Sequence, residues 1–145
     1  MVRRARALLS AMFMTVIIAC ASGPESLGDP NLDAGREIFG RVCSSCHGGT
    51  GAGASAPALT SVLETFPDCE THRQWVTIGS ERWKEEVGDV YGTTGKEITA
   101  IMPSFEAVLT EEEIQQVASF ERFRFGGGEM GAVLADCGLG STSSG

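Results

Sequence analysis

The sequence predicts an all-α fold, and three observations lead to this class. Apolar residues recur at helical spacing in several segments, most clearly towards the C-terminal end. A capping box opens that last segment. No segment of useful length alternates apolar and polar residues as a half-buried strand does. With 145 residues, the chain is long enough for one domain with a modest core.

The first nineteen residues have the features of a signal peptide. Arg3, Arg4 and Arg6 give a basic start, and residues 8–19 form an apolar run that is short for a bilayer span. We expect residues 1–19 to be removed on export, which leaves eight basic and nineteen acidic residues, a net charge of −11. Such a surface does not suit nucleic acid. It favours partners with basic docking patches, or it serves solubility alone.

Cys20 follows the apolar run directly. The pair Ala19-Cys20 resembles the cleavage box of bacterial lipoproteins, in which the cysteine becomes the lipidated first residue of the mature chain. The alternative is an ordinary signal peptide that is cut nearby. On the lipoprotein hypothesis, residues 20–30 form a flexible tether to the membrane, and the protein is extracytoplasmic, in the periplasm or on the outer face of the cell membrane.

The folded domain is expected to span residues 31–128 and to begin with a helix. Asn31 or Asp33 is a candidate N-cap for this helix, which is expected to continue to Cys43. Four of the six residues from 48 to 53 are glycines, so this stretch must be a loop.

Two further helices are expected in the middle of the chain. A short one is predicted at residues 59–66, and a longer one at 69–83, where apolar residues are spaced for a buried face. Residues 88–95 are rich in turn-forming residues, and we predict no regular element there.

The last predicted helix has the clearest signals. Thr110 and Glu113 form its capping box, and a triple glycine at 126–128 ends it. One stripe at helical spacing is expected on its buried side, formed by Ile114, Val117, Phe120 and Arg124. Residues 129–145 are expected to be a C-terminal tail, disordered from residue 138 onward.

Cys43, Cys46 and His47 form a Cys-x-x-Cys-His motif, for which three uses compete. A thioredoxin-like dithiol usually lies in a strand–helix–strand context, which is missing here. Half of a zinc site would need a second pair, such as Cys69 and His72. That hypothesis does not explain why a histidine follows the second cysteine directly.

Covalent haem attachment explains the whole motif. Positions i, i+3 and i+4 of a helical turn share one face, so both thiols and the imidazole of His47 point at one side of a planar ring. The thiols of Cys43 and Cys46 would form thioethers, and His47 would ligate the iron. Because the motif occurs once, we expect one haem c per chain. Three side chains are candidates for the second axial position of the iron: Met102, Met130 and His72.

Two of the five cysteines remain after Cys20 and the motif are set aside. Export places Cys69 and Cys137 in an oxidising compartment, so we predict a disulfide that ties the C-terminal tail back to the domain. Closing so long a loop contributes about 4 kcal/mol on the chain-entropy model. The alternative is two unpaired thiols.

Residues 31–125 resemble the class I cytochrome c family, a small helical fold wrapped around one covalently bound haem. Gly35 and Phe39 match the glycine and the aromatic residue that the family carries on its first helix, four residues apart. The resemblance implies that the first and last helices cross where Phe39 meets Val117 or Phe120. A glycine at such a crossing lets two backbones approach closely.

Two loops extend this resemblance. Pro57 and Leu59 match the family's Gly-Pro-x-Leu loop, although Ala56 replaces the glycine. In the family, the proline carbonyl accepts a hydrogen bond from the axial histidine, here His47. The family's Met-Pro-x-Phe loop supplies the distal iron ligand, and this match identifies Met102 for that role.

The chain departs most from compact family members between residues 67 and 94. Trp75, Trp83 and Tyr91 lie in this segment. They are candidates for lining the haem crevice, for donating to a haem propionate or for plain core packing, and the sequence does not rank them. Cys69 and Cys137 also lie outside the family pattern.

The resemblance implies an electron carrier rather than an enzyme. With both axial positions filled, the iron has no place for a small-molecule substrate, and the partners are expected to be redox proteins and, through the lipid anchor, the membrane. Three alternatives remain: a haem subunit of a larger membrane or periplasmic oxidoreductase, a peroxidase-like enzyme, and a haem-based gas sensor.

Overall fold

The computed structural model describes residues 24–140. The predicted signal peptide, the lipidation site Cys20 and the last five residues of the predicted tail lie outside this range. Within the described range, none of the helices has both the length and the apolar character that a membrane crossing requires.

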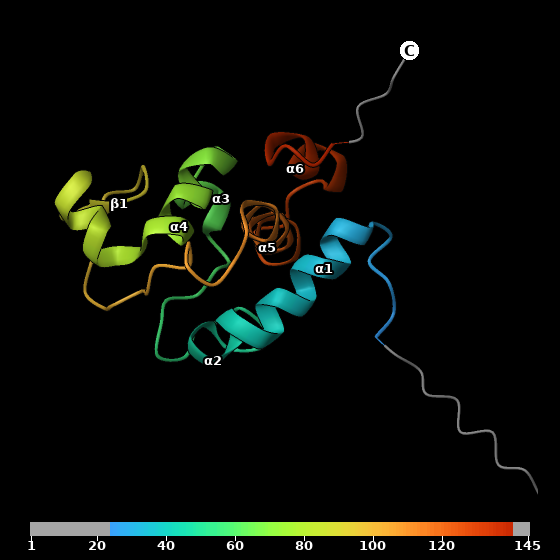
Figure 1. Cartoon of the computed structure of the whole chain (residues 1–145), viewed down its shortest axis with the longest axis horizontal. Coiled ribbons are helices and arrows are strands. Elements are labelled where there is room, and N and C mark those ends of the chain that lie inside the picture. The colour runs from blue at the N-terminus through green and yellow to red at the C-terminus, as the bar shows by residue number, and fades with distance from the viewer. Residues whose placement is uncertain (1–23, 141–145) are drawn as a thin grey trace, which may run out of the picture.

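The described chain is mostly helical, which confirms the predicted fold class. Its helical elements in chain order are α1 (Pro30–Ile38), the π-helical turn η1 (Phe39–Cys43), α2 (Ser44–His47), α3 (Val62–Thr65), α4 (Cys69–Glu86), α5 (Glu111–Arg124) and α6 (Met130–Asp136). In Figure 1, α5 is seen end-on at the centre, with α1 on one side, α3 and α4 on the other, and α6 above it.

Residues 88–95, where no element was predicted, contain the first strand and the turn of a minimal hairpin. Strand β1 (Val90–Tyr91) pairs antiparallel with β2 (Lys96–Glu97), and Tyr91 lies opposite Lys96. Two residues a strand are too few to give an alternating pattern in the sequence. The hairpin is held instead by a tertiary contact, since the Thr93 N–H donates to the Thr65 carbonyl at 2.8 Å.

Helix α1 begins earlier than we predicted. Its N-cap is Asp29, whose carboxylate accepts the Asn31 N–H at 2.8 Å, and Pro30 occupies the first helical position. The candidates Asn31 and Asp33 were therefore wrong as caps. Asp33 lies inside the helix, where its carboxylate accepts the Leu27 N–H at 2.9 Å and fixes the preceding segment.

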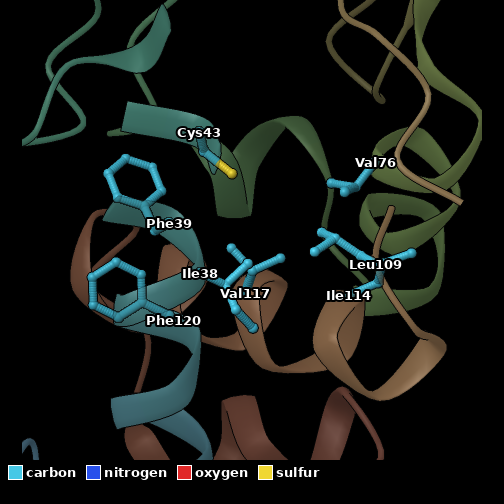
Figure 2. Close-up of a cluster of buried hydrophobic side chains, with 8 residues drawn as sticks. All are labelled: Ile38, Phe39, Cys43, Val76, Leu109, Ile114, Val117 and Phe120. Carbon is cyan, nitrogen blue, oxygen red and sulfur yellow. The ribbon is translucent and has the colours of Figure 1, made fainter. Parts of the chain in front are cut away.

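Helices α1 and α5 cross at Gly35. A Cβ atom at this position would lie 2.7 Å from the carbonyl carbon of Gln116 and 2.8 Å from Cβ of Phe120, so the approach requires glycine. Next to the crossing, the rings of Phe39 and Phe120 pack with their centroids 5.6 Å apart. Figure 2 shows both rings in one buried apolar cluster with Ile38, Cys43, Val76, Leu109, Ile114 and Val117.

Helix α5 has the predicted cap and buried stripe. Thr110 and Glu113 make both bonds of the capping box. The stripe differs from the prediction at its end, because Arg124 is exposed. Arg122 is buried in its place and donates to the carbonyl oxygens of Phe66 and Pro67, at 2.6 and 2.9 Å.

The segment after Gly128 is not a plain tail, because it contains α6. Val133 is buried with Ala118 of α5, and the sulfur atoms of Cys69 and Cys137 lie within bonding distance of each other in the same cluster. Asp136 accepts hydrogen bonds from the Cys69 N–H at 2.9 Å and from Arg122 at 2.8 Å. A helix this short is marginal alone, so its stability comes from these contacts rather than from its sequence.

Candidate haem-binding cleft

A cleft of about 240 Å³ opens between two clusters of buried side chains. One cluster surrounds the α1–α5 crossing and contains Cys43, and the other contains Phe66, Trp75 and Trp83. Met102 packs against both clusters. Most of the side chains that line the cleft are apolar.

The three residues of the Cys-x-x-Cys-His motif line this cleft together. Cys43 is the last residue of η1, and Cys46 and His47 lie in α2. Cys43 is buried, Cys46 is exposed and His47 is half-buried, and both cysteines carry free thiols. The motif therefore reaches from the core to the surface along one wall of the cleft.

The π-helical turn η1 was not predicted. The Ser44 N–H bonds the Phe39 carbonyl, five residues earlier, so one extra residue enters the turn. One extra residue changes the direction in which the following side chains point by about 100° around the helix axis, relative to those of α1. Phe39 can thus face α5 while the motif that follows faces the cleft.

His47 is oriented by the loop that follows the motif. Its Nδ1 lies 2.8 Å from the Pro57 carbonyl oxygen, the contact that the family resemblance implies, and it is present although Ala56 replaces the family's glycine. Because a carbonyl only accepts hydrogen bonds, Nδ1 carries the proton, and Nε2 is left with a lone pair for a metal. The loop is held against α2 by the Ala56 N–H, which donates to the Cys46 carbonyl at 3.0 Å.

Met102 reaches the cleft on a loop that crosses α4. The helix bends at Gly79, where φ is +68°, and a Cβ atom there would lie 2.6 Å from the backbone of the loop. Ser80 fixes Met102 twice: its N–H donates to the Met102 carbonyl, and its hydroxyl accepts the Met102 N–H, both at 2.9 Å. The backbone of Met102 is therefore set by two bonds, and its half-buried thioether lines the cleft.

The structure separates the three aromatic residues that the sequence did not rank. Trp83 donates its indole N–H to the Val90 carbonyl at 2.9 Å, so that group is committed to holding β1. Trp75 and Tyr91 line the cleft and stack with their ring centroids 4.5 Å apart. Burial raises the pKa of Tyr91, which keeps its phenol protonated.

A buried pair in the cleft wall was missed. His72, one of the candidates for the second axial position, is 2% exposed, and its Nε2 lies 3.1 Å from a carboxylate oxygen of Glu121. Both side chains line the cleft. The sequence held a weak signal, since Glu121 follows Phe120 directly on the side of α5 that faces the core.

The cysteine environments weigh against the two other uses of the motif. Burial, together with the charge of Glu121, raises the pKa of the Cys43 thiol, whereas a reactive dithiol needs a lowered one. The second pair that a zinc site would need does not form, because Cys69 is bonded to Cys137 rather than placed beside the motif.

The donor set fits a haem c, since two free thiols, an oriented imidazole and a thioether meet in one largely apolar cleft. Together with the helical fold, this set defines the class of small c-type cytochromes. Residues 30–120 match the family described as cytochrome C oxidase, cbb3-type, subunit III, so the chain belongs to this family of class I c-type cytochromes.

Membership of this family implies covalently bound haem c, electron transfer as the role of the domain, and redox proteins as partners. Members of the c-type cytochrome family are typically extracytoplasmic. No match was found among curated proteins.

Proposed function

We propose that this protein is an extracytoplasmic electron carrier with one haem c, attached through Cys43 and Cys46 and ligated by His47 and Met102. The observation that carries the proposal is that the motif and Met102 line one apolar cleft, with Nδ1 of His47 committed to Pro57. Leu59, half-buried against the cluster of the α1–α5 crossing, adds to the apolar wall.

Each residue of the site has a definite task. When bound, the haem supplies a one-electron couple at its iron. Cys43 and Cys46 fix the group on one wall, and Pro57 sets the orientation of His47. The thioether of Met102 and the apolar lining both favour the ferrous state, because they disfavour the extra positive charge of the ferric state. Exposure of Cys46 leaves that edge close to solvent, where a partner can exchange an electron.

Several features around the domain belong to the same proposal. Residues 1–19 direct export, Cys20 carries a lipid, and the first residues after Cys20 act as a tether that raises the effective concentration near membrane complexes. We propose that Cys69 and Cys137 form their disulfide after export. The strongly acidic mature chain favours redox partners with basic docking patches.

A second candidate function is that of a haem subunit within a larger oxidoreductase. The description of the matching family, which names a subunit of an oxidase, favours it. The two candidates share the same haem site and differ only in assembly. Affinity purification from detergent-solubilised membranes separates them, because a carrier elutes alone and a subunit elutes with fixed partners.

One spectrum tests the ligand assignment. The ferric protein should show a low-spin spectrum with a methionine-to-iron charge-transfer band, and Met102→Ala should abolish this band. Met130→Ala, on α6, is the matched control and should keep it. A high-spin, five-coordinate spectrum of the unmodified protein would contradict the carrier and favour an enzyme or a gas sensor.

A further inference from the structure

Charged side chains line the cleft at two places. Cys43 and Phe120 belong to the cluster of the α1–α5 crossing, and Glu121, next to Phe120, lines the cleft with a carboxylate oxygen 3.1 Å from Nε2 of His72. The β1–β2 hairpin lines the cleft with Tyr91, which packs against the other cluster, with Lys96 and with the exposed Glu97. Met102 packs against both clusters.

Haem has a matching asymmetry. The two side chains that form thioethers lie on one half of the macrocycle, and the two propionate carboxylates lie on the other half. If Cys43 and Cys46 held the first half, the carboxylates would be directed away from that wall, towards another part of the cleft.

Lys96 is the one lysine or arginine that lines the cleft in the described part of the chain. It is half-buried, and its Nζ donates to the hydroxyl of Thr65 at 2.9 Å. A lysine ammonium has three N–H donors, so two remain after this bond. A cation that is partly withdrawn from water is stabilised by an anion placed within reach of those donors.

Contacts within the protein fix the position of Lys96. Thr65 is 3% exposed, and its carbonyl oxygen accepts the Thr93 N–H of the hairpin turn at 2.8 Å. Gly92, with φ at +68°, comes so close to Thr65 that a side chain there would collide with it. The hairpin is thus fastened to Thr65, and Thr65 in turn holds the ammonium at the cleft.

We propose that Lys96 binds a haem propionate through a charge-assisted hydrogen bond, with Thr65 as its positioning residue. The inference rests on the proposed haem site and goes beyond it, because it assigns the carboxylate end of the haem to the hairpin. The β1–β2 hairpin therefore holds a propionate in place and helps to set the midpoint potential of the haem.

Matched variants of the holoprotein test this assignment. Lys96→Gln removes the cation, and the uncompensated propionate should favour ferric iron by about tenfold, a fall of about 59 mV for a one-electron couple. Lys96→Arg should retain most of the unmodified potential. Lys84→Gln is the control, because Lys84 is an exposed lysine of α4 that does not line the cleft.

The pH dependence of the midpoint potential is a second measurement. A purely structural role of Lys96 would leave this pH dependence unchanged. Without Lys96 the propionate should take up its proton at higher pH. The step in the plot of midpoint potential against pH should therefore move up by about one unit in Lys96→Gln, which corresponds to a tenfold change in the proton-binding equilibrium. If Lys96→Gln and Lys84→Gln share the potential and the pH profile of the unmodified protein, the assignment is overturned.

Failure of the Lys96→Gln variant to mature and failure of the protein to bind haem at all must be distinguished. If Lys96→Gln yields no holoprotein, Thr65→Val replaces it and should lower the potential in the same direction by about threefold in the equilibrium constant, less than 59 mV; an unchanged potential would overturn the assignment. Absence of haem from the unmodified protein would instead overturn the proposed function. A normal haem with unshifted variants would overturn only the role of Lys96.

Discussion

At Pro57, a backbone carbonyl decides which nitrogen of His47 is able to reach a metal. The 2.8 Å contact with Nδ1 leaves Nε2 as the free donor. The backbone of Met102 is held in a similar way, because its carbonyl and its N–H both form hydrogen bonds with Ser80. Both ligands of the proposed iron site are therefore oriented by main-chain contacts.

Asp68 shows how a single carboxylate supports the element that carries Ser80. As the N-cap of α4 it accepts the Thr71 N–H at 2.7 Å, and this bond lowers the pKa of Asp68 below its ordinary value of 3.8. We expect Asp68→Ala to reduce the free energy of unfolding at pH 7 by about 1 kcal/mol, the usual contribution of such a cap.

The pH dependence of this loss has a defined sign. Because the folded-state pKa of Asp68 is lowered, its contribution is complete above about 3.8 and is lost as the pH falls through the folded value. Denaturant titrations of both proteins should therefore converge in strong acid. Asp89→Ala, in an exposed turn, serves as the control. An equal gap between Asp68→Ala and the unmodified protein at pH 7 and in strong acid would contradict the cap.

At the residue scale, prediction was possible where the chemistry is local in sequence. The spacing predicts the motif as a haem site, and the resemblance predicts the contact between His47 and Pro57, which the structure contains. The buried partners His72 and Glu121 were missed, because they lie 49 positions apart and meet only through the packing of α4 on α5. Lys96 was missed for the same reason, since its partner Thr65 lies on another element.

At the scale of elements, the α1–α5 crossing holds the cleft in shape. Gly35→Val would drive a branched side chain into the backbone of Gln116, which cannot move aside as a flexible side chain can. We expect the free energy of unfolding of the holoprotein to fall by about 3 kcal/mol, at the upper end of typical overpacking costs. Chemical denaturation followed by circular dichroism measures this loss.

Gly40→Val is the matched control for this substitution. Gly40 lies five residues further along the same helical run, and no atom is found within 4 Å of a Cβ built there. It should change the free energy of unfolding by less than about 1 kcal/mol, because the site has room for the side chain and the helix propensity of valine is slightly higher than that of glycine. Equal losses in the two variants would show that the helix crossing does not depend on glycine.

Prediction of the elements worked where the stabilising interactions are local. The capping box of α5 lies within four consecutive residues, from Thr110 to Glu113, and the helix begins at Glu111 as expected. By contrast, α6 and the β1–β2 hairpin are too short to stand alone, and contacts with distant residues stabilise them. The turn η1 was missed because a π-helical turn leaves no periodic signature over five residues.

At the scale of the whole molecule, the C-terminal segment closes the fold behind the cleft. Cys137 is bonded to Cys69 at the start of α4, and Asp136 accepts bonds from Arg122 and from the Cys69 N–H. These contacts join α4, α5 and α6, the first two of which supply His72 and Glu121 to the cleft wall. The pairing of Cys69 with Cys137 was predictable by counting cysteines, whereas α6, which ends directly before Cys137, was not predicted.

Charge is also arranged over the whole molecule. The chain is acidic, with a formal net charge of −8 at pH 7, and the described residues that line the cleft include one lysine, Lys96, and two carboxylates, Glu97 and Glu121. On the proposed function, the acidic exterior would favour a basic partner, and Lys96 would favour a carboxylate of the haem. The two features act at different ranges, since salt screens exposed charges much more than partly buried ones.

The central claim is that a haem is joined covalently to Cys43 and Cys46. The most direct test is the intact mass, under denaturing conditions, of protein matured in a host that attaches haem to exported proteins. The unmodified protein should carry the added mass of one haem, and so should a Cys69→Ala, Cys137→Ala variant. A Cys43→Ala, Cys46→Ala variant should lack it. Unmodified protein without the added mass would contradict the account.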